Sequence, residues 1–186
     1  MKAASYHRPF AKRSSFRLPF RYVLSAVTIV LLVYFGVQFS RFYQLSPDNL
    51  YKELYRPYPL LQSPIGKYQQ ASRIEDFYGK SSYDSVIRTA KLQVLLSDKE
   101  ALLTGIAYLE TADAFWAIAP LKKLAASGSS PFHDAGEYYL ALAYLKNSDY
   151  DDALTVIQQI RNQANHQYRG TFSEELMDEV KMLKWR

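Results

Sequence analysis

Residues 137–160, EYYLALAYLKNSDYDDALTVIQQI, are the stretch that most narrows the folds open to this chain. Large and small apolar residues recur there at helical spacing on both sides of a short polar segment, Asn-Ser-Asp at 147–149. The side chains of that segment compete with the backbone for hydrogen bonds, which favours a turn. Ala141 and Ala153 are small enough to let two helices approach closely. The stretch therefore predicts a helix, a tight turn and a second helix packed back on the first.

Two further helical pairs precede this one. Residues 67–78 and 82–96 predict the first pair, and residues 99–112 and 114–126 predict the second. Aligning the second helices of the three pairs gives a column whose members lie 31 and 36 residues apart: Val86, Ala117 and Ala153. A flexible connector, SGSSP at 127–131, accounts for the longer spacing. We expect an all-α fold built from stacked helical hairpins.

This arrangement resembles the tetratricopeptide repeat, a pair of helices with a period of about 34 residues. The resemblance covers residues 67–160, within a repeat region of 67–166, and implies about three repeats stacked into a short superhelix. The chain departs from the family at Glu137, where Trp is usual, and Tyr138 is expected to supply the packing there.

The resemblance also implies that the first helices of the repeats line an inner groove that receives a protein or peptide partner. By helical spacing, the residues expected on that face are Ala71, Glu75, Tyr78, Leu102, Ile106, Leu109, Tyr138, Leu142 and Lys146. An equally open alternative is that these residues pack against the next repeat or against residues 58–66 of the chain itself.

Residues 22–40, YVLSAVTIVLLVYFGVQFS, carry no charge over 19 positions. A helix of that length rises about 28 Å, close to the thickness of the hydrocarbon core of a bilayer. Aromatic residues lie near both ends, as in interfacial belts: Phe20, Tyr22, Phe39, Phe42 and Tyr43. These features predict one transmembrane helix. A buried core helix and a cleaved signal peptide are the alternatives, and the apolar run is too long for the latter.

Charge predicts the orientation of this helix. The net charge of +5 arises from seven cations and no acid in residues 1–47, which leaves −2 for residues 48–186. Six of the cations precede the span and Arg41 alone directly follows it. The positive-inside rule then makes residues 1–21 a basic cytoplasmic tail and places the repeats on the other side, in the periplasm of a bacterium with an inner membrane. A mitochondrial inner membrane is a minor alternative, because the start is acid-poor and contains Arg and Ser.

Shorter elements flank the repeats. Residues 41–66 predict a short helix that begins at Ser46 and Pro47, followed by a Pro-rich extended segment. Residues 161–170 are expected to continue the last repeat helix to a break at Gly170. Residues 171–174, TFSE, resemble a capping box that opens a C-terminal capping helix over residues 171–186.

The sequence offers no catalytic constellation, so we expect no enzyme, no cofactor, no metal and no small-molecule substrate. Cysteine is absent, and the three histidines, His7, His133 and His166, are scattered along the chain. We assign His133 to the N-cap region of the third repeat, and Glu174 and Glu175 to the first turn of the last helix, where acids face the helix dipole. The nearly neutral repeat region argues against nucleic-acid binding.

Two functions are consistent with these features. The first is a non-enzymatic, membrane-anchored module that binds a protein or peptide on the non-cytoplasmic side. The second follows from a resemblance to small membrane-anchored tetratricopeptide proteins of Bacteroidetes, carried by the basic tail, one span, LYRPYP at 54–59 and the repeats. It implies a transmembrane regulator, linked to a sigma factor, that acts through its basic cytoplasmic tail.

Overall fold

The computed structural model describes residues 20–60 and 72–185. Residues 1–19 of the predicted basic tail, including His7, fall outside the described residues, as do most of the Pro-rich extended segment and Ala71. The chain divides into two compact units, Met1–Tyr43 and Gln44–Arg186, and each is described by itself. The described residues form helices and no strand, so the predicted all-α class is confirmed.

The first unit contains the helix α1, which runs over Phe20–Gln44 and extends past both ends of the predicted residues 22–40. Its described side chains include ten large apolar ones, from Val27 to Phe39, each at least 49% exposed. No helix among the described residues has both the length and the apolar character that a membrane crossing requires.

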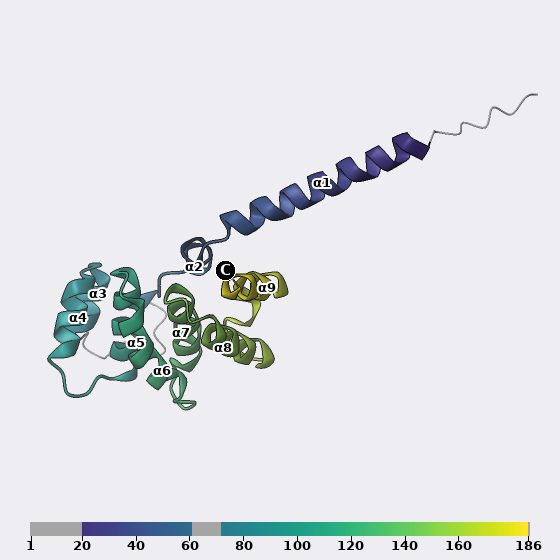
Figure 1. The fold of residues 1–186 in the computed structure, drawn as a ribbon. Helices are drawn as coiled ribbons and strands as arrows, with labels where there is room; N and C mark the ends of the chain where they lie inside the picture. The colour runs from purple at the N-terminus through teal and green to yellow at the C-terminus, as the bar shows by residue number, and fades with distance from the viewer. Residues whose placement is uncertain (1–19, 61–71, 186) are drawn as a thin grey trace, which may run out of the picture. The chain divides into compact units, whose positions relative to one another are not determined.

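The second unit is a stack of helical hairpins preceded by one short helix and closed by another (Figure 1). The short helix α2, Pro47–Leu54, begins and ends where the sequence predicts. The three hairpins and the last helix have these bounds: α3 Arg73–Gly79 and α4 Tyr83–Lys91, α5 Asp98–Glu110 and α6 Ala114–Ala125, α7 His133–Lys146 and α8 Tyr150–Asn162, and α9 Glu174–Lys184.

The three hairpin turns share one backbone conformation. Ser81, Ala112 and Ser148 each have a positive φ, between 54° and 66°. In the second turn the N–H of Asp113 donates to the carbonyl of Tyr108, and that of Ala112 donates to Leu109. The other two turns have the same pair of bonds, which is the Schellman pattern. These residues lie 31 and 36 positions apart, the same spacing as the aligned column in the sequence.

Small residues set the close contacts between helices, as the sequence predicts. Val86, Ala117 and Ala153 have no exposed surface. Gly105 on α5 faces Leu121 on α6 so closely that a Cβ atom built on the glycine would lie 2.5 Å from Leu121 Cγ. Glycine is therefore required there by packing, because real Cβ contacts are longer than 3.0 Å.

The first repeat differs from prediction at both of its helices. The structure places the start of α3 at Arg73, where the Ser72 side chain accepts a hydrogen bond from the N–H of Glu75. It ends α4 at Lys91, five residues before the predicted end at 96. Ser97 and Glu100 form a reciprocal capping box that fixes the start of α5, so residues 92–96 are needed as a connection.

Two predictions about the C-terminal region are also wrong. The helix α8 ends at Asn162, because Gln163 is extended, and Gly170 lies inside a short 3-10 helix, Arg169–Thr171. Residues 171–174 do not form a capping box: Ser173 alone is the N-cap of α9, accepting from the N–H of Leu176. Glu174 and Glu175 occupy the first turn of α9, as expected. The helix α6 continues through Pro120.

Candidate interaction surfaces

The face predicted to hold a peptide is closed by the chain's own helix α2. Leu50, Tyr51 and Leu54 of α2 are buried in the core of the second unit, and α2 packs against α7. The hydroxyl of Tyr138 donates to the carbonyl of Leu54, 84 residues away in sequence. The neighbouring Tyr139 donates in the same way to the carbonyl of Arg56. Two tyrosines of α7 thus bind the backbone at the end of α2.

Tyrosine rings fill the space between α2 and the repeats. The ring of Tyr55 packs edge-on against Tyr139, and its hydroxyl donates to Glu110 on α5. Lys146 Nζ lies 4.3 Å from the centre of the Tyr51 ring and donates to the carbonyl of Leu109 at 2.7 Å. Burial raises the pKa of the Tyr51, Tyr55 and Tyr139 phenols, and the Glu110 carboxylate adds to the rise at Tyr55. These phenols stay neutral and keep their hydrogen bonds.

The predicted groove residues are mostly part of the core. Those with little or no exposed surface are Tyr78, Leu102, Ile106, Leu109, Tyr138 and Leu142. Glu75 forms an ion pair with Lys99 of α5, and Lys146 is engaged by Tyr51 and Leu109 as described above. The chain covers this face with α2 and with the buried Tyr58, whereas the alternative drawn from the sequence named the next repeat or residues 58–66.

An open groove lies on the opposite side of α7, between α6 and α8. It has a volume of about 600 Å³, and its floor is formed by Leu140 and Tyr144 of α7 and Val156 of α8. The rim is polar and carries both charges. The exposed residues of the rim are Lys122, Asp152, Thr155, Gln159 and Gln163, and the half-buried His133 and buried Glu137 line the groove below them. We call this the outer groove.

A buried polar cluster lies beside the outer groove. His166, whose side chain is fully buried, places Nε2 3.2 Å from Glu137 Oε2, and His133 Nε2 lies 3.5 Å from the same oxygen. Gln163 Nε2 donates to that oxygen at 3.1 Å. The N–H of Tyr168 donates to His166 Nδ1, which fixes this nitrogen as an acceptor and leaves Nε2 facing the carboxylate. Among the described residues no group of three such side chains is placed to hold a metal ion.

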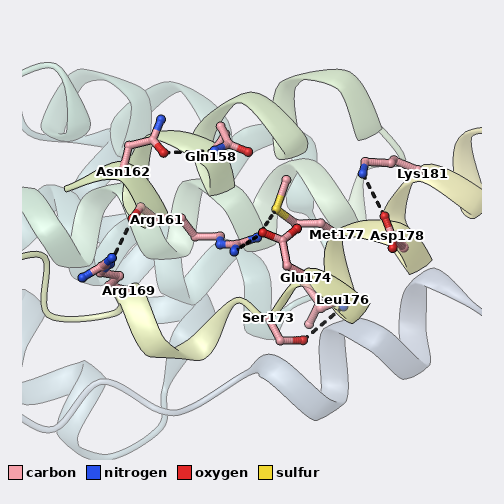
Figure 2. A network of polar contacts seen from close by, with 10 residues as sticks. All are labelled: Gln158, Arg161, Asn162, Arg169, Ser173, Glu174, Leu176, Met177, Asp178 and Lys181. Atoms are coloured by element: carbon pink, nitrogen blue, oxygen red, sulfur yellow. Dashed lines mark hydrogen bonds and ion pairs between the residues drawn. The ribbon is translucent and has the colours of Figure 1, made fainter. Parts of the chain in front are cut away.

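A second polar network joins α8 to the capping helix α9 (Figure 2). The Arg161 guanidinium of α8 reaches both Glu174 and the sulfur of Met177 on α9. Arg169 Nε donates to the carbonyl of Arg161 at 3.0 Å. The hydrogen bond from Arg161 lowers the pKa of the Glu174 carboxyl, so this carboxyl is ionised at neutral pH. The network joins the last repeat helix to the capping helix at the end of the stack.

One surface of the second unit is apolar and exposed. Leu92, Val94 and Leu95, in the connection between α4 and α5, are 83%, 105% and 75% exposed. On α6, Phe115 and Trp116 are 63% and 60% exposed, and their rings contact each other edge-on. We call these five side chains the loop–α6 surface.

Sequence reasoning missed two of these features. It treated the histidines as scattered, although His133 and Glu137 stand at i and i+4, which on a helix places them on one face. It included residues 92–96 in a helix and so did not predict the loop–α6 surface. Comparison with known proteins finds no matching protein-family profile, no matching curated protein and no matching solved structure.

Proposed function

We propose that this chain is a non-enzymatic, membrane-anchored protein-interaction module whose tetratricopeptide-like hairpins bind a protein or peptide partner on the non-cytoplasmic side. Three features support the proposal: the hairpin stack, the charge-free residues 22–40, and an open groove on a stack whose other face is already filled. Binding is the role that fits these three features best.

The anchor rests on the sequence of α1. Nineteen uncharged residues follow six cations, and Arg41 alone follows the stretch directly. The described large apolar side chains of α1 are exposed, as expected for a helix whose surroundings are lipid. The basic residues 1–21 would then stay in the cytoplasm and the second unit would lie in the periplasm.

The outer groove is the observation that carries the binding role. An apolar floor with a polar rim is the composition of many recognition sites, because the floor supplies affinity and the rim supplies specificity. The rim offers Lys122 from α6 and Asp152 from α8, so a bound segment can satisfy a charge of either sign. On the inner face, by contrast, α2 packs against α7 and buries Leu50, Tyr51 and Leu54.

Site-specific photocrosslinking in living cells tests this role. A photoreactive amino acid is placed at Gln159 on the rim, and as a matched control at Gln158, which is exposed on α8 but outside the groove. We expect a discrete crosslinked partner from position 159 and none from 158. Charge reversal by Lys122→Glu together with Asp152→Lys should remove the crosslink while the helical circular dichroism is unchanged. Equal crosslinking from 158 and 159, or none from 159, would contradict the proposal.

A further inference from the structure

The loop–α6 surface has no packing role in the second unit. Val94 is as exposed as in an isolated extended peptide, and Leu92 and Leu95 are nearly so. Large apolar side chains that project this far cost solubility, and a cluster of them marks a surface that contacts something else. The outer groove does not include any of the five.

The α4–α5 connection and α6 meet at a hollow. A hollow of about 420 Å³ is lined on one side by Val94 and Leu95, and on the other by Ala119, Pro120 and Lys123 of α6. Trp116 lies three and four positions before Ala119 and Pro120, which places it on the same side of α6. Phe115 contacts Trp116 through its ring. The hollow thus brings Val94 and Leu95 to the side of α6 that carries Trp116, and Leu92 and Phe115 are their neighbours in sequence.

Basic residues flank the patch. Arg88 and Lys91, in the last turn of α4, precede Leu92, and Lys123 lines the hollow. All three are exposed, and no ion pair is recorded for any of them within the described part of the chain. The nearby acids are Asp98, which lines the same hollow and lies in the first turn of α5, and Asp113, the N-cap of α6. The three cations outnumber the two acids, so the net charge beside the patch is positive.

We propose that the loop–α6 surface is a second membrane contact, in which Leu92, Val94, Leu95, Phe115 and Trp116 enter the interfacial region of a bilayer that contains anionic phospholipid. Lipid is the occupant that the exposure favours, because Leu92, Val94 and Leu95 project into solvent from a connection and a fluid bilayer can surround such side chains. Exposed Trp, Phe and Leu flanked by Lys and Arg is the composition of peripheral membrane surfaces.

This inference rests on the proposed anchor, since a tethered second unit is held at high effective concentration near the membrane. The contact would hold the second unit down on the bilayer with a defined face toward it. The outer groove would then be presented to partners in a fixed orientation.

Fluorescence of the full-length chain in vesicles tests the contact. The chain contains two tryptophans, Trp116 in the patch and Trp185 near the C-terminus, which is 85% exposed. Trp185→Phe isolates the first, and Trp116→Phe isolates the second as a matched control. Each variant is reconstituted in phosphatidylethanolamine and phosphatidylglycerol vesicles, with or without bromine on the acyl chains of the phosphatidylglycerol.

We expect brominated lipid to reduce Trp116 emission by about twofold and to leave Trp185 emission unchanged, because only Trp116 reaches the interface. Lys91→Glu combined with Lys123→Glu, or replacement of the brominated phosphatidylglycerol by phosphatidylcholine with the same brominated acyl chains, should abolish this quenching. Absence of Trp116 quenching in the anionic vesicles would overturn the proposal, and the patch would then be a docking surface for a protein.

An alkaline wash of the same vesicles separates this proposal from the anchor. Chain that resists the wash without Trp116 quenching would retain the anchor and refute the second contact. Chain that is removed by the wash, yet shows Trp116 quenching at neutral pH, would refute the anchor and retain the contact.

Discussion

Three residues with positive φ decide how tightly the hairpins turn. Left-handed backbone costs an L-residue about 1 kcal/mol or more, and Asn, Asp or Ser can recover part of that cost by local hydrogen bonding. Ser81 and Ser148 have such a side chain, and Ala112, with a φ of 64°, does not. The turn between α5 and α6 therefore holds strain that its sequence does not relieve.

We predict that Ala112→Gly raises the free energy of unfolding of the second unit by about 0.5–1 kcal/mol, because glycine adopts a positive φ without steric cost. The same substitution at Ala119, exposed in the interior of α6, should lower it by about 1 kcal/mol through lost helix propensity. Urea unfolding measures both. If both variants have a lower free energy of unfolding than the unchanged chain, the turn at Ala112 is not strained.

Buried tyrosines give the second unit a specific response to alkaline pH. Burial raises the pKa of the Tyr168 phenol to about 12, and it raises those of Tyr58 and Tyr138 as well. In the unfolded chain these phenols ionise near pH 10. The unfolded state therefore loses protons first, so the stabilisation is complete below about pH 10 and is lost as the pH rises to about 12.

We predict that the urea midpoint of the second unit is constant from pH 8 to about pH 9.5 and falls steeply above about pH 10. Tyr168→Phe should make the fall shallower. In the same titration, the phenolate absorbance of the folded chain should rise at a higher pH than that of the chain unfolded in urea. A folded chain whose tyrosines all titrate near pH 10 would contradict this explanation.

At the scale of elements, the helix α2 is the piece that turns an open hairpin stack into a closed one. Its buried residues join the same core as the repeats. Removal of a buried leucine side chain costs about 2–5 kcal/mol. Leu54→Ala should therefore destabilise the whole second unit by about 2–4 kcal/mol in a single transition. Lys52→Ala, on the exposed side of α2, is the control and should change little. A neutral effect of Leu54→Ala would mean that α2 is only loosely docked.

The helical hairpins could be predicted from the sequence because they rest on local spacing. The column of Val86, Ala117 and Ala153 is buried as predicted, and the spacings of 31 and 36 recur in the turns. The pairing of α2 with α7 could not be predicted, since it depends on contacts between Leu54 and Tyr138 across 84 residues. The helix end at Lys91 was missed because the apolar spacing continues through residues 92–96, although the capping box of Ser97 and Glu100 begins α5 directly afterwards.

The candidate sites were less predictable than the fold. Helical spacing identified Leu102, Ile106 and Leu142 as one continuous face, and that face exists as core. Helical spacing alone cannot decide whether a bound peptide or the chain's own α2 covers this face, because both would place apolar side chains against the same residues. The outer groove is formed by three helices at once, and no single stretch of sequence contains its pattern.

At the scale of the whole molecule, we propose that α1 crosses a membrane and places the second unit outside the cytoplasm. Every functional role proposed above depends on the side of the membrane on which the second unit lies. The evidence for it is the uncharged stretch 22–40 and the excess of cations before it.

Paired topology reporters measure most directly on which side of the membrane each end of the chain lies. A reporter that is active only outside the cytoplasm is fused after Arg186 in one chain and after Arg17 in another, with deletion of residues 22–40 as the control. We predict activity from the C-terminal fusion alone, lost on deletion. Activity from the Arg17 fusion alone would reverse the topology, and a C-terminal fusion that is inactive with or without residues 22–40 would contradict the membrane-anchored module outside the cytoplasm.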